Sequence, residues 1–274
     1  MNQDQVKEKL LQLDSEVEDF VVVFSGKSSK KVDGLYKPEN KEILIHNKNF
    51  PDSSDNGILY TAIHEFAHHI QFTKSPKPVT SRSHTSDFYN LLHILLYKAE
   101  ELGIYTNEFE KDEDFKKLTD KIKSEYLAKN GELMKDFGSL LFQAYELCQI
   151  KRASFEDYVD RILGLHRSTA KTLINMNDLN VDHRVGYENM KTLTRIKDDV
   201  IREQAEDAFL KGYSPDMVKA EFVAKDLPDS RLEFLLQERE RVEKGIEKMI
   251  EKLGKLDMQI EEVKQNIDET NESE

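Results

Sequence analysis

One short segment restricts the fold of this chain more than any other. It reads His64-Glu65-Phe66-Ala67-His68, inside a run whose hydrophobic residues recur at helical spacing. Residues four positions apart lie one above the other on a helix face, so both imidazoles can reach one metal ion. Glu65 lies beside them, where its carboxylate can take a proton from a water molecule activated by the metal. We therefore expect a buried helix with a metal site, since unpaired polar groups are costly on a buried face.

A third ligand is required, because a catalytic zinc site has three protein ligands and one open position. The best candidate is His84, which follows His68 after a loop with two prolines and precedes the hydrophobic pattern of another helix. We expect that helix to begin near Ser86, with His84 at or just before its N-terminus. The alternative third ligand is a carboxylate, Glu100 or Glu101, since two histidines and one glutamate also form a catalytic set.

The other histidines carry weaker signals. His69 and His93 fall inside hydrophobic helical runs, so we interpret them as packing residues. The remaining ones, His46, His166 and His183, have no partner at a spacing typical of metal ligands. None of these five histidines belongs to the predicted metal site.

Upstream of the motif, three short segments have the composition of β-strands, at residues 19–24, 32–36 and 42–46. Pro38-Glu39-Asn40 turns the chain between the second and the third segment. We expect a small mixed sheet beside the motif helix. An exposed edge strand of such a sheet can pair with the backbone of an extended peptide.

These patterns together resemble a known group of metallopeptidases. The matching sequence is His64-Glu65-x-x-His68, followed by His84-x-x-x-Phe88-x-x-Leu91-Leu92 and by Ala99-Glu100-Glu101-Leu102-Gly103. It is similar to that of the SprT-like and related zinc metallopeptidases of the zincin class. Residues 34–36 and 41–47 resemble the hairpin before the active-site helix of those proteins, a hairpin that the ImmA/IrrE metallopeptidases share. The resemblance covers about residues 15–105.

The resemblance implies a zinc-dependent endopeptidase with one Zn²⁺ per chain. His64, His68 and His84 would be the ligands, and Glu65 would be the general base. Two observations leave the third ligand open. The ImmA/IrrE proteins usually take an acidic one, and the SprT-like pattern usually has glycine after the third histidine, where this chain has Thr85.

Composition restricts the kinds of partner and the cellular compartment that we expect for this chain. The sequence of 274 residues has a formal net charge of −13, which argues against a general nucleic-acid coat but not against a local DNA-binding surface. Cys148 is the only cysteine, so no disulfide can form within the chain. Neither a signal peptide nor a hydrophobic run long enough to span a membrane is found. We expect a cytoplasmic protein with no membrane partner.

Beyond residue 110 the strand patterns end and helical patterns follow. The segment 154–174 is typical of two helices joined by a turn that contains Gly164, with the spacing of a helix-turn-helix. Ser154 can cap the first helix, and Ser168 or Thr169 can cap the second. The alternative is an ordinary helical bundle in which Gly164 only ends a helix.

The same segment resembles the helix-turn-helix of bacterial and phage DNA-binding proteins, and residues 185–198 are similar to the segment after a ParB-type helix-turn-helix. The resemblance, over about residues 132–225, implies binding to double-stranded DNA with the second helix in the major groove. The candidates for base contacts are the first residues of that helix: Arg167, Ser168, Thr169, Lys171 and Thr172. Such a module could equally bind a protein.

The C-terminal segment carries a separate pattern. Hydrophobic residues recur from 235 to 267 in alternating steps of four and three, interrupted only at Arg239. Isoleucine at most of the first heptad positions, with Val, Met or Leu at the fourth, favours a parallel two-stranded coiled coil. We therefore expect a homodimer through residues 232–267, which would present two helix-turn-helix units to a two-fold DNA site.

The sequence thus predicts an α+β protein in three parts: a zincin-like metallopeptidase domain at 1–110, a helical domain with the helix-turn-helix at 111–226, and a coiled-coil helix with an acidic tail at 227–274. The expected activity is zinc-dependent cleavage of a protein, by hypothesis a DNA-associated one such as a repressor. The alternative is a dimeric, non-enzymatic DNA-binding regulator with a structural metal site. His69 or Glu100 would then be the first candidates for a fourth ligand.

Overall fold

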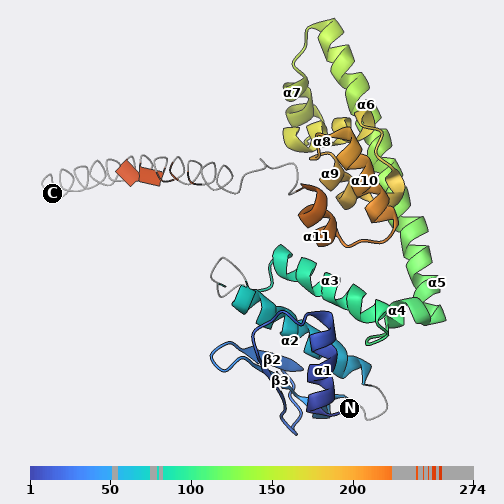
Figure 1. Cartoon of the computed structure of the whole chain (residues 1–274). Helices are drawn as coiled ribbons and strands as arrows, with labels where there is room; N and C mark the ends of the chain where they lie inside the picture. Colours follow the sequence, from blue (N-terminus) through green and yellow to red (C-terminus); the bar gives the residue numbers. More distant parts are fainter. Residues whose placement is uncertain are drawn as a thin grey trace, which may run out of the picture. The chain divides into compact units, whose positions relative to one another are not determined.

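The computed structural model describes residues 1–50, 55–74, 79 and 83–223, together with single positions between 239 and 254. By its internal contacts the chain divides into two compact units, Met1–Ala224 and Lys225–Glu274. The described part is mostly helical and contains one three-stranded sheet (Figure 1), which confirms the predicted α+β class. Within the described residues, no helix combines the length and the apolar character needed to cross a membrane.

The sheet lies in the N-terminal part of the first unit. It contains β1 (Val21–Phe24), β2 (Gly34–Lys37) and β3 (Glu42–Ile45), in the order β1-β3-β2. β1 runs parallel to β3, whereas β2 runs antiparallel to it, so the expected mixed sheet and hairpin are both present. Along β3 the side chains alternate, and Ile43 and Ile45 are fully buried. β2 is an edge strand of this sheet.

Three helices pack with the sheet around one hydrophobic core: α1 (Gln3–Leu13), α2 (Asn56–Lys74) and α3 (Ser86–Glu101). A short 3-10 helix, η1 (Asn47–Asn49), links the sheet to α2. The core takes Ile63 and Phe66 from α2 and Phe88 from α3, all essentially inaccessible to solvent. The predicted start of α3 is confirmed, because Thr85 is its N-cap and accepts a hydrogen bond from the backbone N–H of Phe88.

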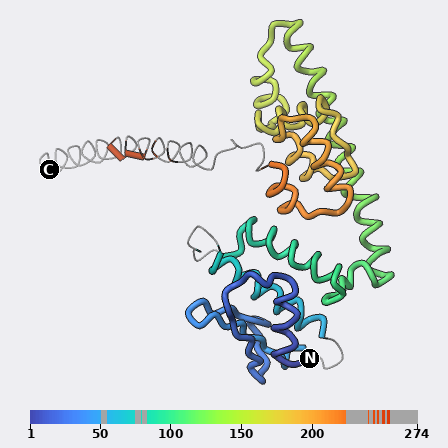
Figure 2. The backbone as a smooth tube through the Cα atoms, in the orientation of Figure 1, coloured from blue at the N-terminus to red at the C-terminus, as the bar shows by residue number. Residues whose placement is uncertain are grey.

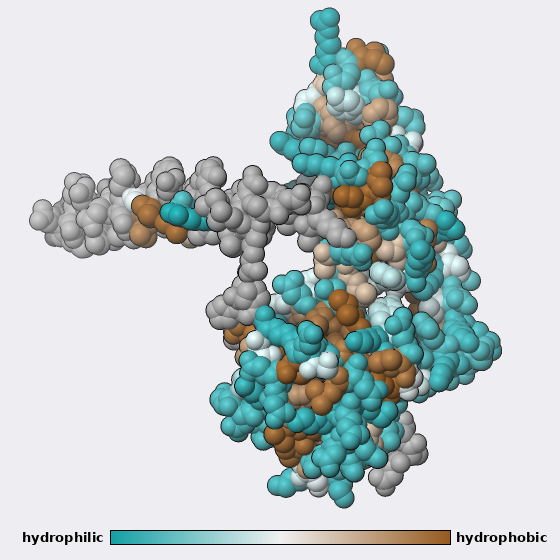
Figure 3. Space-filling model, viewed as in Figure 1, coloured by the Kyte–Doolittle hydropathy of each residue, from teal (hydrophilic) through white to brown (hydrophobic). Residues whose placement is uncertain are grey.

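The rest of the described chain is helical and has a hydrophobic core of its own. Short α4 (Glu108–Lys111) leads to α5 (Glu113–Ile122), the π-helical η2 (Lys123–Ala128) and α6 (Lys129–Lys151), which Figure 2 draws as a long helical run. The elements that follow are α7 (Phe155–Asp157), η3 (Tyr158–Ile162), α8 (Arg167–Asp178), η4 (His183–Val185), α9 (Tyr187–Leu193), α10 (Asp199–Leu210), α11 (Pro215–Val218) and η5 (Lys219–Val223). Hydrophilic side chains cover most of the face drawn in Figure 3, in keeping with the 34% of charged residues.

Helix α8 lies unusually close to the backbone of α6. A Cβ atom at Gly138 of α6 would lie only 2.1 Å from the carbonyl oxygen of Leu173 in α8. A Cβ atom at Gly131 would lie 2.4 Å from the carbonyl oxygen of His183. Backbone oxygens cannot move aside as a flexible side chain can, so glycine is required at both positions for this packing.

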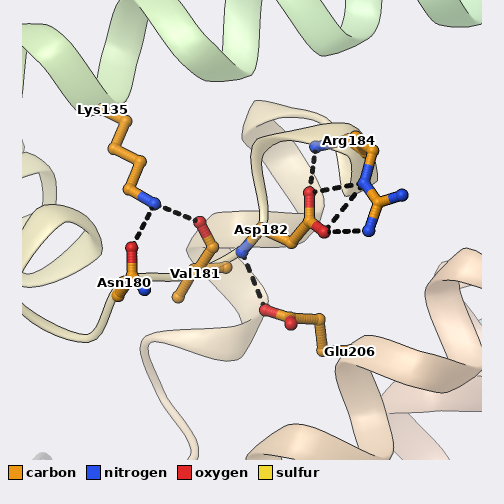
Figure 4. Close-up of polar contacts among 6 residues, drawn as sticks. All are labelled: Lys135, Asn180, Val181, Asp182, Arg184 and Glu206. Carbon is orange, nitrogen blue, oxygen red and sulfur yellow. Dashed lines mark hydrogen bonds and ion pairs between the residues drawn. The ribbon is translucent and has the colours of Figure 1, made fainter.

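Polar contacts fix the chain after α8, as Figure 4 shows. Lys135 of α6 donates hydrogen bonds to the side-chain oxygen of Asn180 at 2.7 Å and to the carbonyl oxygen of Val181 at 3.1 Å. The backbone N–H of Asp182 donates to the carboxylate of Glu206 in α10 at 2.8 Å. The segment that leaves α8 is therefore held from both α6 and α10, which limits how α8 can rotate.

The two helices predicted for the helix-turn-helix are present. The first is formed by α7 and η3, the second is α8, and residues 163–166 join them. Ser154 caps the first helix as predicted, since its side chain accepts a hydrogen bond from the backbone N–H of Asp157. Gly164 adopts φ +64° in the turn, a backbone conformation that glycine takes without strain.

The predicted cap of the second helix is wrong. Helix α8 begins at Arg167, and its N-cap is His166, whose side chain makes no capping hydrogen bond. Ser168 and Thr169 therefore lie inside the first turn, because the chain becomes helical directly after the short turn that Gly164 makes.

The predicted coiled coil lies almost entirely outside the described residues. The positions that are described there, Arg239, Glu243, Ile246, Met249, Ile250, Leu253 and Gly254, are helical. The homodimer through residues 232–267 remains a prediction.

Candidate metal centre

Three histidine side chains converge at one point of the first unit. His64 and His68 come from α2, one turn apart, and His84 comes from the residues directly before α3. The Nε2 atom of His84 lies 3.0 Å from that of His64 and 3.1 Å from that of His68. The three ligand atoms all lie within 4.8 Å of one another. The structure therefore brings the three predicted ligands together in a group that could hold a metal ion.

The chemistry of this group fits a metal cation. A single Nε2 atom carries at most one hydrogen, so the nitrogen of His84 cannot donate to both of its neighbours. A tetrahedral Zn²⁺ with Zn–N distances of about 2.0–2.1 Å would hold its nitrogen ligands roughly 3.3 Å apart, close to the observed spacing. Burial lowers the pKa of His64 to about 4 and also lowers the pKa of His68. Both imidazoles are therefore neutral near pH 7, as metal binding requires.

The ring of Phe88 packs against the imidazole rings of all three histidines. Its ring centroid lies 4.3 Å from that of His68, 4.9 Å from that of His84 and 5.1 Å from that of His64. Only 1% of Phe88 is exposed, so its own position is fixed by the core. An aromatic ring against all three imidazoles restricts their rotation and keeps water from that side of the site.

Gln71, which the sequence did not single out, connects two of the predicted ligands. Its side-chain oxygen lies 3.3 Å from Nδ1 of His68, and its side-chain nitrogen donates to the carbonyl oxygen of Ser83 at 2.8 Å. Ser83 precedes His84, so one side chain orients the ring of His68 and anchors the segment that carries His84. A hydrogen on Nδ1 of His68, shared with Gln71, leaves Nε2 free to bind the metal.

Glu65 lies beside the histidines, and only 7% of it is exposed. Burial raises the pKa of its carboxyl group to about 7, and a hydrogen bond from the backbone N–H of Tyr36 in β2 acts in the opposite direction. β2 approaches this side chain very closely. A Cβ atom at Gly34 would lie 2.6 Å from Cγ2 of Thr61 and 3.0 Å from Cγ of Glu65. Glycine at position 34 thus allows the strand to reach the carboxyl group.

His69 is a packing residue, as predicted from its hydrophobic surroundings. It is fully buried, with one ring nitrogen 3.0 Å from the hydroxyl oxygen of Tyr36 and the other 2.8 Å from the carbonyl oxygen of Glu18. Both nitrogens are therefore already engaged away from the three-histidine group. His69 is not placed to be a fourth ligand.

The alternative carboxylate ligands lie elsewhere. Glu100 lines a different cavity, and Glu101 is exposed on α3. Within the part of the chain that the structure describes, the group of potential metal ligands contains only His64, His68 and His84. His84, rather than a carboxylate, completes the group.

The histidines and Glu65 open into a cavity of about 450 Å³. Its walls come from residues 32–36, from α2 and from the segment before α3. Leu35 of β2 is 47% exposed and lines this cavity, as does Tyr60 of α2. The site therefore borders the edge strand of the sheet, and a ligand that enters it meets the backbone of β2.

The candidate DNA-contacting residues lie in the first turns of α8. Arg167, Ser168 and Lys171 are exposed, whereas Thr169 and Thr172 are half-buried. The Thr172 hydroxyl donates to the carbonyl oxygen of Ser168 at 2.9 Å, so it is satisfied within the helix. The guanidinium group of Arg167 forms an ion pair with Asp160 of the preceding helix.

Comparison of the chain with known protein families, with curated proteins and with solved structures finds no match. Function must therefore be argued from the site itself.

Replacing Gln71 by leucine should weaken zinc binding. The variant loses both the acceptor for His68 and the donor to Ser83, and outer hydrogen bonds of this kind are commonly worth about 10–100-fold in metal affinity. Competition with a chromophoric chelator measures the dissociation constant. Gln143→Leu, on the exposed face of α6, is the matched control and should bind as wild type does. Equal affinity of Gln71→Leu and wild type would contradict the bridging role.

Replacing Glu65 by glutamine should change how stability depends on pH in the metal-free protein. The folded-state pKa of about 7 lies above the ordinary value of 4.5, so folding favours the protonated carboxyl group. That stabilisation is present at low pH and is lost as the pH rises through 7. Relative to Glu65→Gln, wild type should lose about 2–3 kcal/mol of unfolding free energy between pH 5 and pH 8.

Urea denaturation at the two pH values gives this difference. The titration of His64 contributes to the unfolding free energy of both proteins, so its contribution cancels when the two are compared. Bound zinc should shrink the difference, since a nearby dication lowers the pKa of a carboxyl group. A wild-type-minus-variant difference that stays constant with pH would show that Glu65 titrates as an ordinary carboxylate.

Proposed function

We propose that this protein is a zinc-dependent endopeptidase. The observation that carries the proposal is the combination of three convergent histidines with one buried carboxyl group of raised pKa, all at a single cavity. Three protein ligands leave a coordination position for a reactant, which is typical of catalytic rather than structural zinc. A carboxyl group with a pKa near the working pH suits general acid–base catalysis.

The division of labour follows from these residues. His64, His68 and His84 would hold the zinc ion, which when bound supplies a Lewis acid for the scissile carbonyl and for a water molecule. Glu65 would take the proton of the attacking water and later return it to the leaving amine. Its hydrogen bond from the Tyr36 N–H ties the carboxyl group to β2, which lines the same cavity.

The edge strand supports a peptide as the substrate. β2 pairs with β3 on one side only, and residues 33–36 line the cavity beside the histidines. An extended peptide can pair with such a strand through main-chain hydrogen bonds, and exposed Leu35 offers an apolar contact. The substrate class proposed is therefore an unfolded or extended segment of a protein.

The alternative is a non-enzymatic DNA-binding regulator with a structural metal. It requires a fourth protein ligand and gives Glu65 no chemical role. Within the described residues His69 and Glu100, the first candidates for that ligand, point to other partners. Burying the Glu65 carboxyl group raises its pKa and costs folding free energy when the group is ionised. A purely structural metal site has no use for such a group.

We further propose that the helical part binds double-stranded DNA and that the substrate is a DNA-associated protein such as a repressor. The support is the pair of helices joined at Gly164 and the exposed cations of α8. Lys171 forms no ion pair among the described residues, whereas Arg167 would have to exchange Asp160 for a base or a phosphate. Lys171 is therefore the more informative residue to test.

The peptidase proposal predicts zinc-dependent cleavage by the full-length protein. The zinc-loaded chain is incubated with a peptide library made from a digested proteome, and new N-termini are identified by mass spectrometry. Cleavage should fall by about 10²–10⁴-fold in Glu65→Gln, because the general base is lost while the zinc ligands remain. Exposed Glu101→Gln is the control and should cleave as wild type does. Equal cleavage by Glu65→Gln would contradict the proposal.

The DNA proposal predicts that wild type selects particular duplexes from a random pool. Lys171→Ala should lower affinity for a selected duplex about tenfold, in the range of one good base contact. Lys117→Ala, exposed on α5, should lower it much less. Fluorescence anisotropy at fixed salt measures both. Failure of wild type to bind any duplex would overturn this proposal and leave the peptidase proposal standing.

A further inference from the structure

A second cavity lies next to the metal centre and is lined by aromatic side chains. Its volume is about 300 Å³. Tyr60 of α2, Tyr97 of α3, Tyr105 and Phe109 all contribute to its walls. The ring centroids of Tyr60 and Tyr105 lie 6.2 Å apart at an angle of 43°. Four aromatic rings therefore border one small space.

A carboxylate shares this cavity with the rings. Glu100 lies on α3, one turn after Tyr97, and lines the same walls. Burial and the neighbouring Glu110 raise its pKa, while a hydrogen bond with Asn107 lowers it. Among the described residues, no lysine or arginine lines the cavity or forms an ion pair with Glu100. The cavity therefore has a negative group but no positive one.

The one other titratable base in the walls does not supply a positive charge. His93 lies 2.7 Å through Nδ1 from the hydroxyl oxygen of Ser214, and burial lowers its pKa. It is therefore neutral near pH 7. Burial is the main cause that raises the pKa of Tyr97 and of Tyr105. The charges of Glu100 and Glu110 raise the pKa of Tyr97 further, and the charge of Glu100 also raises that of Tyr105, so the negative electrostatic field reaches both rings.

The cavity is open to solvent and adjoins the metal site. Tyr60 and Tyr97 are 43% and 39% exposed, and Phe109 is 62% exposed. Tyr60 lines this cavity and the metal-site cavity alike, and it lies one helical turn before His64. A peptide bound along β2 at the metal site could therefore place a side chain beside Tyr60.

Aromatic rings around a carboxylate are the surroundings that an organic cation prefers, because ring faces and the carboxylate both attract positive charge. We propose that this cavity is a specificity pocket for the ammonium or guanidinium group of a lysine or arginine side chain in the protein substrate. Tyr60, Tyr97 and Tyr105 surround the cation, and Glu100 neutralises it. The inference that the cation belongs to the substrate rests on the proposed peptidase function, whereas the cation site itself does not.

Binding is tested first, without any cleavage. The full-length protein, with ¹³C-labelled tyrosine rings, is titrated with Nα-acetyl-lysine amide and with Nα-acetyl-norleucine amide, which has a similar stem but no ammonium group. The lysine derivative should shift the signals of Tyr60, Tyr97 and Tyr105 and should bind about tenfold more tightly. Glu100→Gln should remove most of that preference, and exposed Glu101→Gln should retain it. Equal binding of the two derivatives, or a preference unchanged in Glu100→Gln, would overturn the cation site.

Cleavage then identifies the source of the cation. In the peptide-library experiment, lysine and arginine should be enriched at one fixed position relative to the cleaved bond. Glu100→Gln should lose this enrichment, whereas exposed Glu101→Gln should keep it and should cleave at the wild-type rate. A free polyamine such as spermidine is the competing occupant. If it binds more tightly than the lysine derivative and the cleaved sites show no enrichment, the pocket belongs to a small amine and the substrate role is overturned. If no peptide is cleaved at all, the peptidase proposal fails and the binding result is unaffected.

Discussion

The burial of ionisable side chains along α2 is the constraint on which the N-terminal part depends. Glu65, His68 and His69 are only 7%, 7% and 0% exposed. Each would destabilise the fold by about 1–3 kcal/mol or more without a polar partner. Tyr36 forms hydrogen bonds with two of them, through its backbone N–H to Glu65 and through its hydroxyl group to His69. Gln71 forms a hydrogen bond with His68. The strand that borders the site is therefore fixed to the helix by the groups that the site itself buries.

Local spacing was enough to predict much of this arrangement. The i,i+4 rule placed His64 and His68 on one helix face, and the hydrophobic pattern after Ser86 placed His84 at the entrance of the next helix. The same reasoning favoured His84 but left Glu100 or Glu101 as the alternative, because helical spacing does not say which side of α3 meets α2. In the folded chain Glu100 faces a separate cavity.

The partners of the ligands could not be predicted in this way. Gln71 follows His68 closely, yet its role depends on which ring nitrogen of that histidine points to the metal. Tyr36 is far from α2 in sequence, and its contacts depend on the clearance that Gly34 provides. The capping prediction at Ser168 failed for a related reason, since several residues before a helix can cap it and only the turn geometry selects one.

Helix α3 connects the metal centre with the helical part. Its first residue, Ser86, forms a hydrogen bond with Asp216, and His93 forms one with Ser214. His84, the proposed third ligand, lies just before this helix. Any proposed coupling between a DNA-binding surface and the metal site would therefore have its shortest physical route along α3, through packed and hydrogen-bonded groups.

The central claim is that three histidines form an open zinc site. The most direct test is X-ray absorption at the zinc edge, together with metal content by mass spectrometry, for wild type, His84→Ala and Glu65→Gln. The account predicts one zinc per chain with three imidazole ligands and at least one further light-atom ligand that is not a protein group. It predicts that His84→Ala loses the metal and that Glu65→Gln keeps it with the same imidazole number. A zinc ion retained in His84→Ala with an unchanged spectrum, or no zinc uptake by wild type, would contradict it.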